Sequence, residues 1–329
     1  MIYFWPKKLA RVSLTYCLCL IFTCFTLSAS ANERIVNILD GSFADMQINN
    51  IQVLDATLVG ERIIMVGEQG LILLSDDQGE NWLSAVTNTK VTLTAVHFND
   101  KDNGWAVGHR GILLQSQDGG KTWLRVQVDL PDNNAFFDVL FENENKGIAL
   151  AAFGIIAETT DGGRTWISRT ILHEDEFFDM HLYGVAVLEN DTMIIASEQG
   201  NLLRSTDAGK NWQLIDSPYE GSYFGVLTAN NNRILVYGMR GNIYSSDDAG
   251  DSWTKIELGG KMAIQGATLW ADGRIAIAGS GSYIAISNDN GSSFKRIPIN
   301  GRADMISAFD AGKTNIMTFG LRGFSKRSY

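Results

Sequence analysis

Three arginines stand at equivalent places in a Gly-x-x-Gly segment that recurs along the 329-residue chain. Arg110, Arg240 and Arg322 each lie directly before the closing glycine of their copy. A guanidinium group donates paired hydrogen bonds to a carboxylate. Three of them around one opening would suit a carboxylate or a peptide. The alternative is that they are solvated turn residues without a function.

Aromatic residues gather in three of the longer segments between repeats. They occur as the pairs Phe136-Phe137, Phe177-Phe178 and Tyr223-Phe224. One ring of each pair is expected to begin a buried strand and the other to lie on the rim. Exposed aromatic rings beside arginine are typical of protein interfaces. Phe137, Phe178 and Tyr223 therefore join the three arginines as candidate partner-binding residues, with burial in the core as the alternative.

Sequence patterns typical of catalytic, nucleotide-binding or metal-binding sites are absent or weak. The sequence has no Ser-His-Asp spacing, phosphate-binding loop or nucleotide fingerprint. His173 and His181, with the acidic residues 174–176 between them, suggest a metal site. A solvated acidic loop is the simpler interpretation. We therefore expect no cofactor and no resident metal, and we expect that the chain is not an enzyme.

Composition indicates an ordinary globular protein with many tight turns. Hydrophobic residues make up 45% and charged residues 19% of the chain, and it holds 33 glycines but only 4 prolines. These values exclude a disordered or collagen-like chain. The net charge of −10 argues against a nucleic-acid partner, because such proteins carry a basic surface.

The first 31 residues have the order of a signal peptide. Lys7, Lys8 and Arg11 precede an apolar run over 12–27, and the small residues Ala29-Ser30-Ala31 follow. The run is short for a membrane span, so we expect cleavage after Ala31 and a periplasmic protein. An uncleaved anchor is the alternative. Cleavage would remove all three cysteines and leave a net charge of −13.

The remaining chain repeats one motif seven times. The pattern Ser-x-Asp-x-Gly-x-x-Trp recurs after each Gly-x-x-Gly segment, although the last copies are incomplete. Its first residue recurs at intervals of 41 to 46 residues, at Ser75, Ser116, Thr159, Ser205, Ser246, Ser287 and Ser328. Each unit holds four short apolar runs with strand composition, and this period is typical of a propeller blade. Residues 32–329 are therefore predicted to form one all-β, seven-bladed β-propeller of four-stranded blades.

The two ends of the chain predict how the ring closes. The seventh unit has runs for three strands, over 306–310, 315–319 and 324–328, and then the sequence stops. A spare strand-like run, Arg34–Leu39, precedes the first blade. If it supplies the fourth strand of the last blade, no sheet edge is left free.

The motif resembles the Asp-box, or BNR repeat, of sialidases and other propellers. Together with the Gly-x-x-Gly frame and the seven units behind a signal peptide, it resembles the photosystem II stability/assembly factor family and its exported bacterial relatives, over about residues 33–329. The resemblance implies a non-enzymatic, monomeric helper that binds a membrane protein or membrane complex at its periplasmic face. A transporter accessory is a special case of this role.

A glycan-binding or sialidase-like glycosidase is the alternative function. Such an enzyme needs an arginine triad and a tyrosine nucleophile, for which Arg110, Arg240 and Arg322 with Tyr183 or Tyr223 are superficially suitable. The sialidase Arg-Ile-Pro signature precedes the first Asp-box, whereas here 296–298 follows the last complete copy. Sialidases also have six blades, so the protein-binding interpretation is favoured.

Overall fold

The computed structural model describes residues 51–131, 134–171, 180–312 and 315–329, all within one compact unit, Gln47–Tyr329. The predicted signal peptide, the run Arg34–Leu39, the acidic segment 173–176 and Phe178 lie outside these residues. Cleavage after Ala31 and closure by an N-terminal strand therefore remain predictions.

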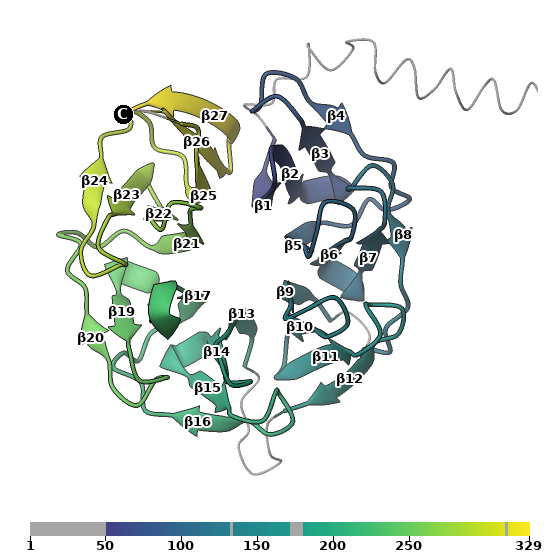
Figure 1. Cartoon of the computed structure of the whole chain (residues 1–329), viewed down its shortest axis with the longest axis horizontal. Helices are drawn as coiled ribbons and strands as arrows, with labels where there is room; N and C mark the ends of the chain where they lie inside the picture. Colours follow the sequence, from purple (N-terminus) through teal and green to yellow (C-terminus); the bar gives the residue numbers. More distant parts are fainter. Residues whose placement is uncertain (1–50, 132–133, 172–179, 313–314) are drawn as a thin grey trace, which may run out of the picture. The chain divides into compact units, whose positions relative to one another are not determined.

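The described residues form seven antiparallel sheets, each a meander of strands in chain order (Figure 1). We call each sheet a blade. The first four blades contain the strands β1 (Val53–Val59), β2 (Arg62–Gly67), β3 (Ile72–Ser75), β4 (Leu83–Ser84); β5 (Leu93–Phe98), β6 (Gly104–Gly108), β7 (Leu113–Ser116), β8 (Leu124–Arg125); β9 (Phe136–Phe141), β10 (Gly147–Ala151), β11 (Ile155–Thr159), β12 (Ile167–Thr170); and β13 (Leu182–Val187), β14 (Met193–Ser197), β15 (Leu202–Ser205), β16 (Gln213–Ile215).

The last three blades are β17 (Tyr223–Thr228), β18 (Ile234–Gly238), β19 (Ile243–Ser246), β20 (Thr254–Lys255); β21 (Ile264–Leu269), β22 (Ile275–Gly279), β23 (Tyr283–Ser287), β24 (Lys295–Ile297); and β25 (Met305–Asp310), β26 (Asn315–Gly320), β27 (Gly323–Ser328). The seventh blade thus has three strands within the described residues, where the others have four. The predicted seven-bladed, all-β propeller is confirmed. The first strand of each blade lies nearest the centre of the ring (Figure 1).

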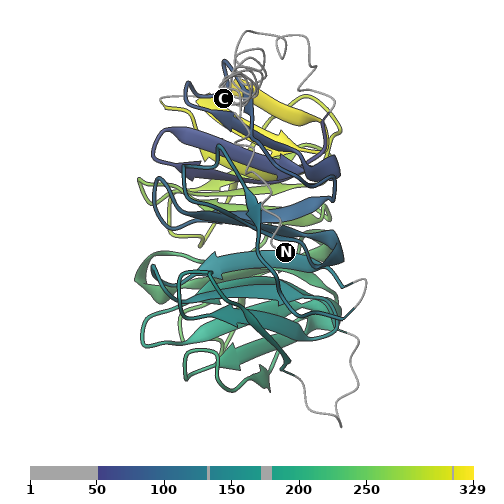
Figure 2. The same ribbon diagram turned by 90° about the vertical axis from the view of Figure 1, so that its right-hand side faces the viewer.

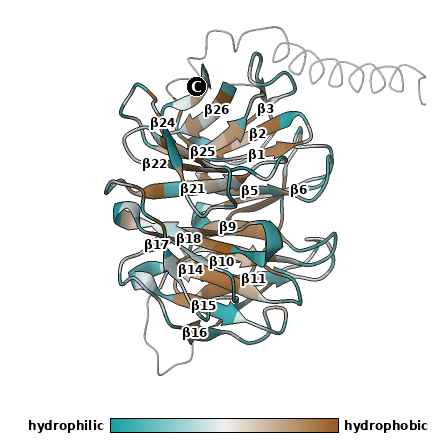
Figure 3. Cartoon of the chain, turned by 60° about the vertical axis from the view of Figure 1, so that its left-hand side comes forward, coloured by the Kyte–Doolittle hydropathy of each residue, from teal (hydrophilic) through white to brown (hydrophobic). Residues whose placement is uncertain are grey.

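Apolar side chains hold the blades together on both faces of every sheet. The second strand of a blade is almost wholly buried, and its alternate residues enter the two flanking interfaces. In β18, for example, Ile234 and Val236 pack toward the fourth blade, whereas Leu235 and Tyr237 pack toward the sixth. Figure 3 shows the resulting hydrophobic strands between hydrophilic turns. The described side chains form seven such clusters, one between each pair of neighbouring blades.

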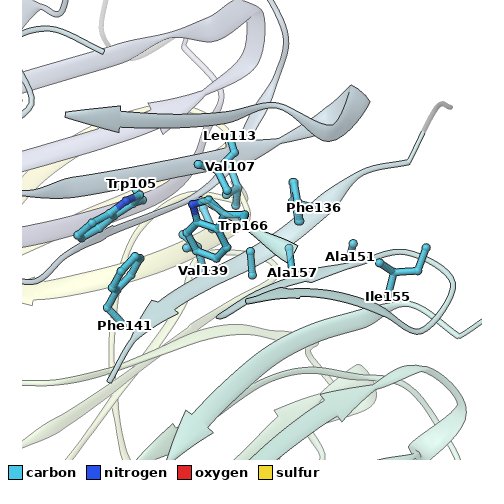
Figure 4. Packing of buried hydrophobic residues seen from close by; sticks show 12 residues of the cluster. Trp105, Val107, Leu113, Phe136, Val139, Phe141, Ala151, Ile155, Ala157 and Trp166 are labelled. Atoms are coloured by element: carbon cyan, nitrogen blue, oxygen red, sulfur yellow. The ribbon is translucent and has the colours of Figure 1, made fainter. Parts of the chain in front are cut away.

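The interface between the second and third blades shows how these clusters pack (Figure 4). The ring of Trp105 stacks on Phe141 with centroids 3.6 Å apart, and Trp166 meets Phe141 edge-on at 5.7 Å. The same kind of packing joins the seventh blade to the first, where Phe324 contacts Trp82 at 5.2 Å. The ring is therefore closed by apolar contact among the described strands.

The Ser-x-Asp-x-Gly turns connect the third and fourth strands. The Asp118 carboxylate accepts hydrogen bonds from the Ser116 hydroxyl at 2.9 Å and from the Thr122 amide at 2.9 Å. The Trp123 indole donates to the Gly120 carbonyl at 2.8 Å, and its ring enters the core between the first two blades. Gly120 has a φ of +86° and so adopts a conformation that favours glycine. The turn thus ties a surface loop to an inter-blade core.

Two aspartates on the inner strands bridge neighbouring blades. One oxygen of Asp55 accepts the amide of Val96 at 2.8 Å, and one oxygen of Asp138 accepts the amide of Val185 at 3.0 Å. Burial raises the pKa of Asp55 to about 7 and that of Asp138 to about 6, even though these amide bonds act in the opposite direction. Desolvation therefore outweighs hydrogen bonding at both carboxyls.

Deletion of residues 32–39 should expose the edge of the seventh blade. We expect a lower melting temperature or aggregation, because an unpaired strand edge recruits other chains. Thermal unfolding and size-exclusion chromatography measure both effects. A truncated protein that stays monomeric and equally stable would contradict closure by this segment.

Replacing Asp118 with alanine removes the acceptor for a turn amide and two hydroxyls. By analogy with lost helix caps, we expect unfolding to become easier by about 1 kcal/mol. Denaturant unfolding measures the change, with Asp102→Ala as the surface control. Binding of a partner should persist in both variants; its loss from a fully stable Asp118→Ala protein would make the turn a binding site.

Stability should fall as the pH rises from about 4 to 7. The folded pKa values of Asp55 and Asp138 lie above that of an unfolded aspartate, so the folded state holds more protons in this window. Asp55→Asn and Asp138→Asn should each reduce the decline in melting temperature between pH 5 and pH 8. Asp216→Asn, at an exposed carboxylate, should leave it unchanged. Equal declines in all four proteins would be evidence against buried, proton-holding carboxyls.

Candidate functional site

The turns between the second and third strands of the blades form one face of the ring, which we call the turn face. Figure 2 shows the blades edge-on, with turns at both ends of the strands. Six of these turns hold a non-glycine residue at positive φ: Gln69, Arg110, Phe153, Gln199, Arg240 and Ser282. This left-handed conformation is uncommon for residues other than glycine. Six of the seven turns thus present different side chains on a similar left-handed backbone.

The three predicted arginines all lie exposed on the turn face, but in different blades. Arg110 and Arg240 lie in the short 3-10 turns His109–Gly111 and Met239–Gly241, and Arg322 lies between β26 and β27. Arg240 lines a cavity of about 610 Å³ beside Tyr219 and Glu220. Arg322 lines a separate cavity of about 210 Å³. The structure therefore does not gather the three guanidinium groups into one pocket.

These arginines have no ion-pair partner within the residues that the structure describes. In contrast, ion pairs between 2.6 and 3.4 Å hold five other arginines, namely Arg62, Arg169, Arg204, Arg233 and Arg274. These five ion pairs connect strands and turns of the blades. Those of the turn face are available to a carboxylate from outside.

Exposed apolar side chains accompany the arginines. Phe153, Met239 and Leu321 are 50%, 38% and 40% exposed, and all three lie in these turns. Met239 and Leu321 directly precede Arg240 and Arg322. Large apolar groups are usually withdrawn from water, and their grouping on one face is typical of an interaction surface. These three residues were not among the predicted partner-binding residues.

An aromatic cluster joins this face to the centre of the ring. We define it as Phe137, Phe153, His181, Tyr183 and Phe224. Phe137 stacks on His181 at 5.3 Å, and Phe153 meets His181 edge-on at the same distance. Tyr183 contacts Phe137 at 5.3 Å and Phe224 at 6.2 Å. The cluster spans three consecutive blades.

Glu198 organises the centre of the aromatic cluster. Its carboxylate accepts the Tyr183 hydroxyl at 2.8 Å and the His181 amide at 3.2 Å. Burial, together with this hydrogen bond to a carboxylate, raises the pKa of Tyr183 above its usual value. The phenol of Tyr183 therefore keeps its proton. Glu198 comes from the turn between β14 and β15, and Tyr183 from β13, the inner strand of the same blade. Because 15 residues separate them in the sequence, no local pattern indicated this contact.

Tyr223 was predicted as a partner-binding residue, but the structure places it in the core. Its side chain is 0% exposed and packs in the core between the fourth and fifth blades, where its hydroxyl lies 3.0 Å from the Ser217 hydroxyl. A register shift follows directly in β17, and the next residue, Phe224, faces the central cavity instead. The same arrangement buries Phe136 and leaves Phe137 facing the cavity. Of the predicted aromatic residues, Phe137 alone is placed at the site among those described.

The described residues include no group of three or more His, Cys, Asp or Glu side chains arranged to hold a metal ion. Within the same residues, no helix has the length and apolar character required to cross a bilayer.

Solved structures share this fold at low sequence identity. YCF48 from Cyanidioschyzon merolae is 18% identical, with a TM-score of 0.67, over 85% of this chain and 96% of that one. A structure of YCF48 bound to a D1 peptide is 16% identical, with a TM-score of 0.65, over 85% and 92%. A streptogramin B lyase structure is 12% identical, with a TM-score of 0.69, over 84% and 93%. The lyase shows that the fold also occurs in an enzyme.

Comparison of the sequence with known families gives one family match, although no curated protein matches the chain. The family model described as Photosynthesis system II assembly factor YCF48 matches residues 37–131 and 125–297, which span most of the seven-bladed ring. The chain therefore belongs to the YCF48 assembly factor family.

Proposed function

We propose that this chain is an exported, non-enzymatic propeller that binds a membrane protein and helps to assemble or support its complex from the periplasmic side. Membership of an assembly factor family supports a protein-binding role. A protein of the same fold has been solved with a D1 peptide. The observation that carries the proposal is the turn face, where exposed apolar groups adjoin unpaired guanidinium groups.

The residues of the turn face suit an extended segment of a partner. Phe153, Met239 and Leu321 offer apolar surface that a partner would remove from water. Arg110, Arg240 and Arg322 offer guanidinium groups for its carboxylates. Because these groups lie in different blades, we infer that the partner spans several turns rather than inserting one acidic group into one pocket.

The cellular setting of the proposal rests on the predicted leader. Cleavage after Ala31 would release residues 32–329 to the periplasm as a monomer. Mass spectrometry of the exported protein determines the cleaved bond. A transporter accessory would use the same surface with a different membrane partner.

Replacing Arg110, Arg240 and Arg322 with alanine should weaken capture of the membrane partner by the tagged protein. Exposed charges are screened over about 10 Å at 0.1 M salt, so binding by the wild-type protein should also decrease as salt is raised. The fold should persist, because exposed turn residues contribute little to stability. Quantitative capture from detergent-solubilised membranes at low and high salt measures both effects.

A matched control uses three exposed arginines outside the turn face. Arg125 and Arg296 lie on outermost strands, and Arg164 lies in a Ser-x-Asp-x-Gly-type turn. Their replacement with alanine changes the net charge equally and should leave capture intact. Equal losses in both triple variants would mean that overall charge, rather than the turn face, determines binding.

One observation favours the alternative, a sialidase-like or glycan-binding protein. The Tyr183 hydroxyl lies 2.8 Å from the Glu198 carboxylate, as a tyrosine nucleophile and its base would. However, the raised pKa of Tyr183 disfavours the phenolate that attack requires. The three arginines also do not converge on this pair. Turnover of any member of a glycoside panel, abolished by Tyr183→Phe, would replace the assembly role with this one.

A further inference from the structure

The inner strands surround a cavity of about 810 Å³ at the centre of the ring. Strands β1, β5, β9, β13, β17, β21 and β25 all contribute to its wall, and Figure 1 shows them facing the central space. No lysine or arginine belongs to the described lining, whereas Asp55 and Asp138 do. The described lining therefore has acidic groups and no lysine or arginine beside them.

The two carboxyls occupy the same position, the third residue of their inner strands. Each oxygen of each carboxyl accepts one backbone amide at 2.8 to 3.0 Å. A carboxylate oxygen has two acceptor sites, so both groups can accept further donors. The charge of Asp138 adds to the burial that raises the pKa of Asp55. The two carboxyls therefore interact electrostatically, and no lysine or arginine in the described lining compensates their charge.

Ser307 provides an independent sign of an absent donor or acceptor. It occupies the same third position in β25 and lines the same cavity. Its side chain is only 5% exposed, yet its hydroxyl has no hydrogen-bond partner within the described residues. A buried hydroxyl without a partner destabilises the folded state. A ligand that donates to this oxygen would remove the penalty.

Aromatic rings form one side of the cavity wall. Phe137, Tyr183 and Phe224 occupy the second position of three consecutive inner strands. Neighbouring rings in this row lie 5.3 and 6.2 Å apart and are inclined at 70° and 81°. The face of an aromatic ring attracts a cation, and its apolar surface also suits an aliphatic chain.

We propose that the central cavity binds an alkylammonium ion, the group carried by a lysine side chain or a free aliphatic amine. The aliphatic chain lies along Phe137, Tyr183 and Phe224. The ammonium group donates hydrogen bonds to the carboxylate oxygens of Asp55 and Asp138, and Ser307 offers a further acceptor on the same wall. This site is inside the ring and goes beyond the proposed function, which depends on the turn face.

The chemistry of the wall favours an organic cation over a metal ion. Calcium takes six to eight oxygen ligands and magnesium prefers an octahedral shell. The described residues offer no metal-holding group of acidic or histidine side chains, and five of the seven inner strands present an aliphatic or aromatic side chain at the second position. An ammonium ion on an aliphatic stem uses both the oxygens and the rings.

Isothermal titration calorimetry with matched ligands at pH 8, above the pKa values of both carboxyls, tests the proposal. The probes are Nα-acetyl-lysine methylamide and n-butylammonium, and the neutral control is Nα-acetyl-norleucine methylamide. We expect saturable one-to-one binding of the cations and at least tenfold weaker binding of the control. A preference for the lysine amide over n-butylammonium indicates a partner's side chain as the natural occupant, and equal affinity indicates a free amine.

Variants separate the carboxyls from the aromatic wall. Asp55→Asn with Asp138→Asn should weaken lysine-amide binding at least tenfold, whereas Asp216→Asn outside the cavity should not change it. Phe224→Leu keeps an apolar side chain, removes the ring face and should weaken binding several-fold. This variant tests the site even if the double variant fails to fold.

Any of four results would overturn the proposal. Three are absence of saturable cation binding, equal binding of the norleucine amide, and full affinity in a folded double variant. The fourth is displacement of the lysine amide by calcium at equal concentration, since it would make the cavity a metal site. None of these results bears on capture of a membrane partner by the turn face, so the two proposals can fail separately.

Discussion

Burial of apolar side chains between neighbouring blades is the constraint on which the whole ring depends. No single sheet can hide both of its faces, so every blade requires two neighbours. The second strands show this directly, since their alternate residues enter two different cores. A closed ring gives every blade the two neighbours that it needs to bury both faces. The cluster that joins Phe309 and Phe319 to Val53 and Trp82 is therefore as necessary as any other.

This constraint leaves the two ends of the strands free to differ. At one end the Ser-x-Asp-x-Gly turns repeat nearly the same hydrogen bonds and send a tryptophan into an inter-blade core in most copies. At the other end the turns keep their backbone and vary their side chains. The turns at one end of the strands thus stabilise the contacts between blades, whereas those at the other end can bind a partner. The inner strands form a third surface, which lines the central cavity.

The fold was largely predictable because its signals are local and repeated. The repeat length, the four apolar runs and the turn residues each lie within a few residues of one another, so pattern alone determined seven blades. The aromatic site was less predictable. Whether Tyr223 or Phe224 faces the central cavity depends on a register shift at the start of β17 that no composition rule marks. Contacts such as Tyr183 with Glu198 and Phe137 with His181 join different strands or blades, and only the folded ring brings them together.

The left-handed backbone of the turns also limits which side chains can appear there. The described residues include fourteen non-glycine residues at positive φ, and none of them is valine, isoleucine or threonine. Branching at Cβ makes that conformation especially unfavourable. The turn positions therefore accept a set of residues that are not branched at Cβ, and glutamine, phenylalanine and arginine all occur there. New specificities can be sought in a combinatorial library that draws on this set at Gln69, Arg110, Phe153, Gln199 and Arg240, without redesign of the ring.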